Sequence, residues 1–471
     1  MMDAPRQDGE AARVLQAHRG FLDAKRRGWT FGRAEPEPWP LDAQDWKSGR
    51  ERVTVSAIMS KTESLSCDIA IIGGGIAGLT AAVALGSLGF EVTCVDAQPP
   101  QPEKAPELDG RTTALLQGSV RALALLDVWP RCEAAAEGLW VMRIVDESGR
   151  REPGTVTFDS REMEEAPFGY NVPNAALRQA LLARIAGMKG VRHLAPVKLE
   201  TLRFESAQAV AELADGRSLS ASLAIGADGR NSRSREAAGI VVKRWTYGQT
   251  AMAFSLSHSH PHEGVSTEFH RTSGPFVLVP MPGNRSSVVW VERERAAPGF
   301  LALDEGSFRH AVQERTRGVL GTVEQVGPRF SYPVGTLLAE RYAAHRLALI
   351  GESAHALPPV GAQGLNLGIT DVATLAEVLV EARRAGQDVG AEAVLERYES
   401  RRRPDVVARV FAIDGLNRAV KTRFPPFQAL RHLGLAAVER VPGLKATLMR
   451  QGMQPVGEVP SLMRGIPLRP L

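Results

Sequence analysis

An uncharged stretch from Ile69 to Phe90 that contains six glycines constrains the fold of this chain more than any other feature. The stretch is long enough to span a membrane. It opens, however, with a short β-rich run and continues with a glycine cluster, so a buried strand, a tight turn and a buried helix explain it better. We expect a strand at 67–72, a helix at 76–88 and a second strand at 91–96, which together make a βαβ unit.

The glycine cluster has the pattern G-x-G-x-x-G and lies between the first strand and the helix. Glycines at these positions allow a tight turn and a close approach to a pyrophosphate, which the start of the helix would bind. Asp96 ends the second strand 18 residues after Gly78, where a carboxylate can accept hydrogen bonds from both hydroxyls of a ribose. The pattern predicts a dinucleotide with a free 2′-hydroxyl, either FAD or NAD. The candidate ligands are Gly73, Gly75, Ile76, Ala77, Gly78 and Asp96.

Two further motifs follow apolar runs that we expect to be strands. The first, at 223–232, delivers Asp228 to a glycine turn, for which an ordinary structural turn is the alternative. The second is a strand at 347–351 that ends in a glycine and Glu352, followed by a loop rich in proline and glycine and by a helix at 365–385. The start of that helix can face the pyrimidine edge of an isoalloxazine ring and stabilise negative charge on a reduced flavin.

Composition and charge exclude several classes of protein. The chain has 471 residues and a net charge of +4, which argues against bulk binding of nucleic acid. Its three cysteines are far apart and match no metal or redox spacing, so we expect reduced thiols in a cytosolic protein. His258, His260 and His262 alternate, but no Cys or acidic cluster completes a metal site, and we predict none. His355 is expected to be a satisfied, partly buried histidine rather than a catalytic base.

Three motifs in this order and at these separations resemble the flavin monooxygenases typified by para-hydroxybenzoate hydroxylase. Within that class the chain is similar to the ubiquinone-biosynthesis hydroxylases, through DGRTTALL at 109–116, YNVPN at 170–174, GAQGLNLGITDV at 361–372 and LMRGIPL at 462–468. The resemblance covers roughly residues 66–470. It implies an α/β fold, in which a Rossmann-like FAD-binding domain carries an inserted β-rich substrate domain and a helical C-terminus.

The resemblance also implies a reaction and roles for individual residues. Reduced FAD would react with oxygen to give a flavin hydroperoxide, which hydroxylates the aromatic ring of a polyprenylated phenol or quinone precursor in ubiquinone biosynthesis. Arg111 would contact the pyrophosphate and Asp228 would support the dinucleotide. Glu352, which stands where the class commonly has Asp, would contact ribityl or ribose hydroxyls. Backbone contacts to the flavin would come from Gly361, Gly364, Leu365 and Asn366, and Pro358, Pro359 and Gly361 would line the reactive side.

The expected division of the chain follows from the motifs and the resemblance. Residues 1–64 are charged and lack an apolar period, so we expect a disordered extension, and a native start at Met59 is an alternative. Residues 113–126 have helical spacing, and residues 245–333 are β-rich. We expect an FAD-binding domain at 65–137, 168–238 and 334–390, substrate-domain segments at 138–167 and 239–333, and a helical basic C-terminal region at 391–471.

The sequence leaves several alternatives open. The substrate is either the quinone precursor or a small soluble aromatic acid, and a non-catalytic FAD-containing subunit of a biosynthetic complex or a flavin dehydrogenase is a further alternative. Electrons would come from NADH, NADPH or a ferredoxin-type donor that binds transiently, because there is no second complete Rossmann unit. The tail at 416–471 carries nine Lys or Arg against two Glu. It is either a solvated face of a packed helix or a surface that docks this cytoplasmic protein on the inner face of the cell membrane or on an acidic partner.

Overall fold

The computed structural model describes residues 63–99, 111–147, 154–163, 166–359, 361–421 and 458–471, together with scattered positions between 438 and 449. The expected N-terminal extension and most of the basic tail therefore lie outside the described residues. Strand β1 begins at Ser64, the last residue of the expected extension, and Ser64 pairs with Ser218.

An eight-stranded sheet contains the predicted βαβ unit. Five of its strands are parallel, in the order β19-β11-β1-β2-β8. Since β2 lies on one side of β1 and β11 on the other, the strand order reverses between β1 and β11, and open α/β sheets bind their ligands outside the carboxyl ends at such a point. The strands are β1 (Ser64–Ile72), β2 (Val92–Val95), β8 (Val191–Leu194), β9 (Leu199–Phe204), β10 (Ala209–Leu213), β11 (Ser218–Gly226), β18 (Ala343–Ala344) and β19 (Leu347–Leu349).

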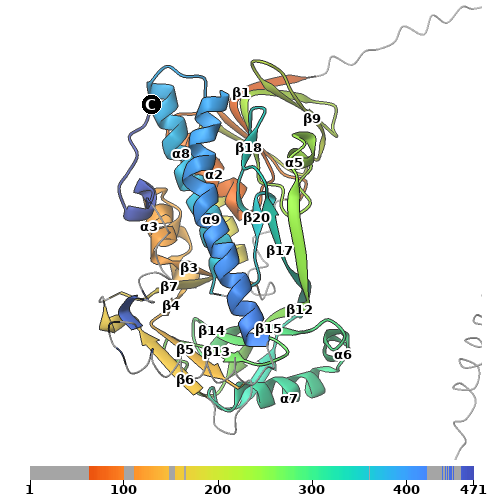
Figure 1. The fold of residues 1–471 in the computed structure, drawn as a ribbon, viewed down its shortest axis with the longest axis vertical. Coiled ribbons are helices and arrows are strands. Elements are labelled where there is room, and N and C mark those ends of the chain that lie inside the picture. The colour runs from red at the N-terminus through yellow and green to blue at the C-terminus, as the bar shows by residue number, and fades with distance from the viewer. Residues whose placement is uncertain are drawn as a thin grey trace, which may run out of the picture. The chain divides into compact units, whose positions relative to one another are not determined.

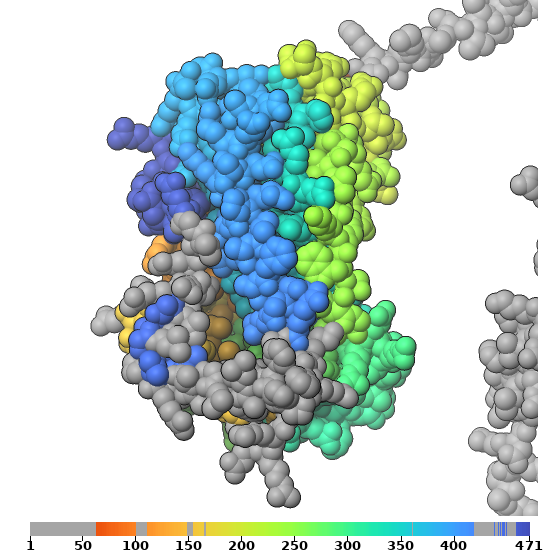
Figure 2. Space-filling view, viewed as in Figure 1, coloured from red at the N-terminus to blue at the C-terminus, as the bar shows by residue number. Residues whose placement is uncertain are grey.

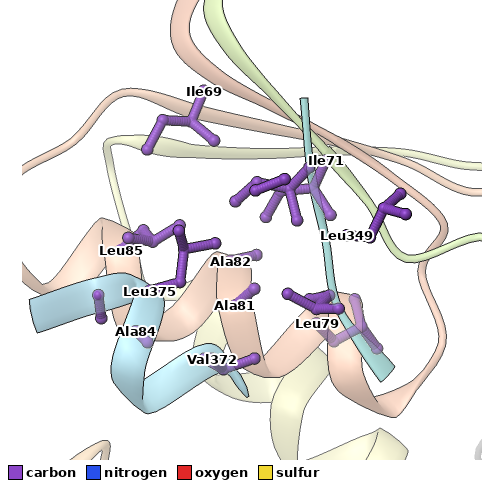
Figure 3. Close-up of a cluster of buried hydrophobic side chains, with 14 of the residues drawn as sticks. Ile69, Ile71, Leu79, Ala81, Ala82, Ala84, Leu85, Leu349, Val372 and Leu375 are labelled. Atoms are coloured by element: carbon purple, nitrogen blue, oxygen red, sulfur yellow. The ribbon is translucent and has the colours of Figure 1, made fainter. Parts of the chain in front are cut away.

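Helix α2 (Ile76–Ser87) packs between this sheet and helix α8 (Gln363–Arg384). Its small side chains allow the helix to approach both neighbours closely, so the uncharged stretch at 69–90 is a buried strand, turn and helix, as the glycines predicted. Helices α4 (Asn174–Ala186) and α5 (Arg233–Ala237) complete this region. Figure 3 shows part of the shared core, with Ile69, Ile71, Leu79, Ala81, Ala82, Ala84, Leu85, Leu349, Val372 and Leu375 labelled.

A nine-stranded sheet forms the second large element. Its strands pair antiparallel, except for β13 and β5, which run parallel. Two helices that the β-rich composition of 245–333 did not predict, α6 (Ala297–Leu301) and α7 (Glu305–Thr316), contribute to its separate aromatic core. The strands are β5 (Val141–Asp146), β6 (Gly154–Asp159), β12 (Val242–His258), β13 (Val265–His270), β14 (Phe276–Met281), β15 (Arg285–Arg293), β16 (Val323–Val326), β17 (Phe330–Ala339) and β20 (His355–Ala356).

A small three-stranded sheet corrects one prediction. The helix expected at 113–126 begins only at Gln117, as α3 (Gln117–Leu125), because residues 112–116 form strand β3 (Thr112–Leu116). Two β-branched threonines start this strand, and it pairs with β7 (Gly169–Pro173), which also pairs with β4 (Glu137–Leu139). Short 3-10 turns complete the elements: η1 (Trp129–Arg131), η2 (Glu133–Ala135), η3 (Ser160–Glu162), η4 (Gly351–Ser353) and η5 (Ser461–Arg464).

Two long elements connect the sheets. Helix α9 (Glu392–Lys421) packs along α8 and then reaches β12, where Asp414 accepts hydrogen bonds from Trp245 and Tyr247 (Figure 1). Strand β12 pairs with both β17 and β15, so it extends from the vicinity of the first sheet through the second. The space-filling view shows α9, in blue, as a continuous surface beside the green segment that includes β12 (Figure 2). Among the described residues, no helix is both long and apolar enough to cross a membrane.

Candidate active site

The glycine turn after β1 has almost no free volume on one side and is open on the other. A Cβ on Gly73, whose φ is +111°, would lie 2.3 Å from the carbonyl oxygen of Ala227, and one on Gly78 would lie 1.9 Å from the carbonyl oxygen of Gly73. A Cβ on Gly75 would meet nothing within 4 Å, and Gly75 is exposed. The turn therefore packs tightly against the end of β11 and leaves Gly75 exposed at the carboxyl ends of the strands, where a ligand can approach the backbone.

Two neighbouring helices, α2 and α8, start without a side-chain cap. The N-caps of α2 and α8, Gly75 and Ala362, make no side-chain capping hydrogen bond, and neither helix has an acidic residue in its first turn. Ala362 follows Gly361, and both have a positive φ, which turns the chain sharply into α8. First-turn N–H groups have no partner within a helix, and with the helix dipole they favour an anionic ligand.

Asp96 lies at the end of β2, as predicted, and its carboxylate is buried beside the glycine turn. One oxygen accepts a hydrogen bond from the Gln98 N–H at 3.0 Å, and the other accepts one from Nη2 of Arg178 at 2.8 Å. Arg178 on α4 also donates to the carbonyl oxygen of Gly74. One guanidinium thus fixes both the carboxylate and the turn, although nothing in the sequence around Arg178 had indicated this role.

The Asp228 motif lies next to the glycine turn, with its backbone against Gly73. Oδ2 of Asp228 accepts hydrogen bonds from the N–H and the hydroxyl of Ser234, both at 3.0 Å, at the start of α5. Its Oδ1 is buried and has no hydrogen-bond partner among the described residues. A buried acceptor without a donor is costly, so this oxygen is available to a donor on a ligand. Gly229 beside it has a φ of +80° and open space at its Cβ position.

Glu352 lies one residue after Gly351 in the turn η4 that follows β19. Its Oε1 accepts hydrogen bonds from Nε and Nη2 of Arg230, at 3.0 and 2.8 Å. Burial raises the pKa of Tyr332 on β17, and the charges of Arg230, Glu352 and Arg111 also act on that pKa, which puts these four side chains in one neighbourhood. The guanidinium of Arg111 lies 5.3 Å from the centroid of the Phe330 ring.

A buried charge network stands behind this turn. Asp371 on α8 accepts hydrogen bonds from the Gly351 N–H, from Nε2 of His355 and from Nε of Arg402 on α9. Burial raises the pKa of Asp371, but the side chains of His355 and Arg402 outweigh that effect and hold it below its ordinary value. His355 is buried rather than partly buried, and only one of its ring nitrogens has a partner: Nε2 contacts Asp371, whereas Nδ1 has no hydrogen-bond partner among the described residues.

Asn366, in the first turn of α8, holds the small sheet against that helix. Its Oδ1 accepts from the Leu116 N–H and the Ser119 hydroxyl, and its Nδ2 donates to the carbonyl oxygens of Ala114 and Ala362. Its side chain is thus occupied by the protein. The neighbouring Gly361 and Gly364 are exposed and Leu365 is half-buried, whereas Pro358 is buried and Pro359 half-buried.

These features fit FAD. The exposed backbone at Gly75 can approach a pyrophosphate, the Asp96 carboxylate beside the turn can accept from a ribose, and the starts of α2 and α8 carry no side-chain cap. The unpartnered Asp228 oxygen adds an acceptor for a hydroxyl or an amine. The predicted ligands from 73–78, 96, 228, 352 and 361–366 thus come from the strand ends and helix starts of one sheet.

The sequence pattern of the FAD binding domain matches residues 66–412. The chain is 41% identical over 406 residues to the ubiquinone hydroxylase UbiL of Rhodospirillum rubrum, covering 85% of this chain and 93% of that protein. The chain belongs to the FAD-dependent monooxygenases, among the ubiquinone-biosynthesis hydroxylases. It is also 31% identical over 388 residues to the 3-demethoxyubiquinol 3-hydroxylase of Escherichia coli, covering 82% of this chain and 98% of that protein.

Solved structures agree on the fold of this monooxygenase. The p-nitrophenol 4-monooxygenase PnpA from Pseudomonas putida superposes with a TM-score of 0.69 at 18% identity, covering 84% of this chain and 100% of that one. The probable FAD-dependent monooxygenase PqsL from Pseudomonas aeruginosa gives 0.64 at 23% identity, covering 79% and 99%. The predicted fold, the enzyme class and FAD as cofactor are confirmed.

The histidines that suggested a metal have other partners. His258 contacts the carbonyl oxygen of His260 and the Ser286 hydroxyl, and His262 contacts the carbonyl oxygen of Met281. Among the residues that the structure describes, no group of three His, Cys, Asp or Glu side chains is placed to hold a metal ion.

Sequence reasoning missed four arginines of the site. Arg230 and Arg235 lie within seven residues of Asp228, so their closeness to that motif was a usable signal. Arg178 and Arg402 lie on helices far from any motif, and no pattern in the sequence marks them.

Proposed function

We propose that this enzyme hydroxylates the aromatic ring of a polyprenylated phenol or quinone precursor in ubiquinone biosynthesis. The observation that carries the proposal is the match to a ubiquinone hydroxylase over 93% of that protein's length, at 41% identity. A match of this extent includes the region that follows the glycine turn, the nine-stranded sheet and α8, rather than the FAD-binding turn alone. Relatives from bacteria and from vertebrate mitochondria that carry ubiquinone-biosynthesis names support the same substrate class.

We assign the binding of FAD to the crevice at β1 and β11. FAD supplies the two electrons and the activation of dioxygen when it is bound and reduced. The helix start at α2 would hold the pyrophosphate with Arg111, and Asp96 would accept from the adenosine ribose. The start of α8 would face the pyrimidine edge of the ring and stabilise negative charge there. The proposed ligands are Gly73, Gly75, Ile76, Ala77, Gly78, Asp96, Arg111, Asp228, Glu352, Gly361, Gly364, Leu365 and Asn366.

The reaction asks the protein for position and for exclusion of water more than for acid or base groups. One oxygen atom of O₂ replaces a ring hydrogen as a hydroxyl, and the other leaves as water, with two electrons and two protons supplied. Pro358, Pro359 and Gly361 precede α8 and follow β20, which pairs with β17 of the nine-stranded sheet. This pairing supports the proposal that a rigid loop would separate the flavin from a substrate lying against that sheet.

The electron donor and the cellular partners are finer parts of the proposal. The electrons would come from NAD(P)H or a ferredoxin-type protein that binds transiently. The protein would work in the cytoplasm at the inner face of the cell membrane, with its basic tail at 416–471 against anionic lipid or a biosynthetic complex. The division into an FAD-binding domain at 65–137, 168–238 and 334–390, a substrate domain at 138–167 and 239–333 and a C-terminal region at 391–471 belongs to the same proposal.

A comparison of two substrate series tests the proposal. The purified enzyme with FAD and a reductant would be given polyprenylated phenols and, separately, the same rings with a carboxylate in place of the tail. We expect turnover of the prenylated series, with kcat/KM rising as the tail is lengthened, and accumulation of an under-hydroxylated quinone precursor in a deletion strain. Turnover of the small acids alone would contradict the substrate class. A requirement for the protein with no turnover of either series would identify it as a non-catalytic subunit.

A further inference from the structure

The geometry points to Arg230 as a positioning residue that aims the carboxylate of Glu352 at FAD. The inference rests on the proposed role of Glu352 as an acceptor for a hydroxyl of FAD. Arg230 places both Nε and Nη2 on a single oxygen, Oε1, at 3.0 and 2.8 Å. Oε2 accepts no hydrogen bond from any residue that the structure describes. The pair therefore fixes one oxygen and leaves the other open to a donor.

The backbone around Glu352 is already fixed by other contacts. The N–H of Gly351 donates to buried Asp371 at 2.9 Å. On the other side, the carbonyl oxygen of Ser353 accepts from Nη1 of Arg235 at 2.8 Å, and the Ser353 hydroxyl donates to backbone oxygens of Gly226 and Ile350. The residues that flank Glu352 are both buried, whereas its own side chain is 51% exposed. These contacts fix the backbone on both sides of Glu352 but not its side chain, which Arg230 alone holds among the described residues.

The backbone of Arg230 is held by the same structure. Its carbonyl oxygen accepts hydrogen bonds from Nη2 of Arg235 at 3.1 Å and from Nη2 of Arg244 at 2.7 Å. Arg235 is almost fully buried and bonds the backbone of residues 230 and 353 together. This guanidinium sets the separation of the two chain segments, and the Arg230–Glu352 pair closes the gap between them through side chains.

Arg230 restricts the rotamers of the long Glu352 side chain before FAD binds. Without Arg230, the Glu352 carboxylate would sample several rotamers, and FAD would have to order it on binding. Because the side chains of Arg230 and Glu352 are 35% and 51% exposed, solvent screens their ion pair, and the pair adds little to the stability of the fold. Arg230 should therefore matter for FAD affinity and hardly at all for the stability of the apoprotein.

A double-mutant cycle on FAD binding tests this assignment. The apoprotein of the wild type, Arg230→Ala, Glu352→Gln and the double variant would be titrated with FAD by flavin fluorescence, without any substrate. We expect Arg230→Ala to weaken FAD binding about tenfold, the size of effect expected from ordering one long side chain. In the Glu352→Gln background the same change should have little further effect. The thermal midpoint of each apoprotein should stay close to that of the wild type.

Arg217→Ala is the matched control. Arg217 also places Nε and Nη2 on one oxygen, of Asp215, in a partly exposed pair in the turn between β10 and β11. The next residue, Ser218, pairs with Ser64 at the end of β1 opposite the glycine turn. Its FAD affinity should equal that of the wild type. Wild-type affinity in Arg230→Ala, additive losses in the double variant, or an equal loss in Arg217→Ala would each overturn the assignment. Failure of the wild type itself to bind FAD would instead contradict the proposed function.

Discussion

The Asp371 carboxylate accepts a hydrogen bond from the Gly351 N–H at 2.9 Å on one oxygen and from Nε of Arg402 at 2.9 Å on the other. Asp371 is fully buried and Arg402 nearly so. Three separate segments meet at this carboxylate: the turn after β19, helix α8 and helix α9. The same turn carries Glu352, and the same helix begins at the loop that we propose binds the flavin. The network would therefore hold both parts of the proposed site in place from the interior of the protein.

Replacing Arg402 with methionine should destabilise the protein strongly. The change would leave the buried Asp371 without its guanidinium partner, and breaking a buried ion pair by removing one member costs about 3–5 kcal/mol. Denaturant unfolding of the apoprotein would measure the loss. Arg401→Met, next along α9, is the control, since its pair with Glu381 is half-exposed and its removal should cost less than about 1 kcal/mol. Similar losses in both variants would contradict a special role for Arg402.

The free energy of unfolding should depend on pH through the ionisation of Asp371. Its pKa is lower in the folded than in the unfolded protein, so its contribution is fully present above the unfolded value of about 3.9 and is lost as the pH falls through the folded pKa. The difference in unfolding free energy between the wild type and Asp371→Asn should be constant from about pH 5.5 to 8 and shrink below about pH 4. Urea unfolding at a series of pH values would measure it. A difference that changes between pH 6 and 8 would assign the titration to another group.

Alanine substitutions at two glycines of the same turn should have different effects, one on stability and the other on FAD binding. Gly73→Ala puts a Cβ 2.3 Å from the Ala227 carbonyl oxygen at a positive φ, so the fold itself should lose more than about 1 kcal/mol. Gly75→Ala meets open space, so the apoprotein should unfold like the wild type, while FAD binding weakens about tenfold or more because the methyl lies where the backbone approaches the pyrophosphate. Unfolding curves and FAD titrations would separate the two. Normal FAD affinity in Gly75→Ala would contradict the placement of the cofactor.

Arg178 should be needed for FAD binding although no motif contains it. Arg178→Met would free both the Asp96 carboxylate and the Gly74 carbonyl from their shared charge-assisted donor. We expect FAD affinity to fall about tenfold or more, since hydrogen bonds to charged groups are roughly twice as strong as neutral ones. Arg184→Met, on the same helix, is the control because Arg184 contacts the Leu126 carbonyl and Asp127 instead. Equal FAD affinities in the two variants would contradict a role for Arg178 in FAD binding.

The parts of the fold that periodicity controls were predictable. The βαβ unit, the strand before Asp228 and helix α8 follow from local apolar patterns and glycine turns, and the structure confirms them. Strand β3 was assigned to a helix because Leu115, Val120, Leu123 and Leu126 have helical spacing. Its pairing with β7 and the bond from the Leu116 N–H to Asn366, 250 residues away, decide otherwise, and neither contact is local.

The site was predictable where backbone conformation demands glycine and not where side chains meet across the fold. The turn could be found because Gly73 and Gly78 leave no room for a Cβ, and the loop because Gly361 has a positive φ that favours glycine. The arginine partners of Glu352, Asp96 and Asp371 come from other elements of the fold. Local patterns in the sequence do not predict such pairs. The departure at Glu352 could be noticed in the sequence, but its pairing with Arg230 needed the structure.

Incorporation of labelled oxygen tests the central claim most directly. The FAD-loaded enzyme would be reduced, mixed with a prenylated phenol and exposed to ¹⁸O₂, and the product examined by mass spectrometry. We predict one ¹⁸O atom in the ring hydroxyl for each two electrons consumed, and no label when H₂¹⁸O replaces labelled dioxygen. Two results would contradict the assignment as a ring hydroxylase. One is a product that carries oxygen from water, and the other is reoxidation of the flavin with release of hydrogen peroxide while every candidate ring is left unchanged.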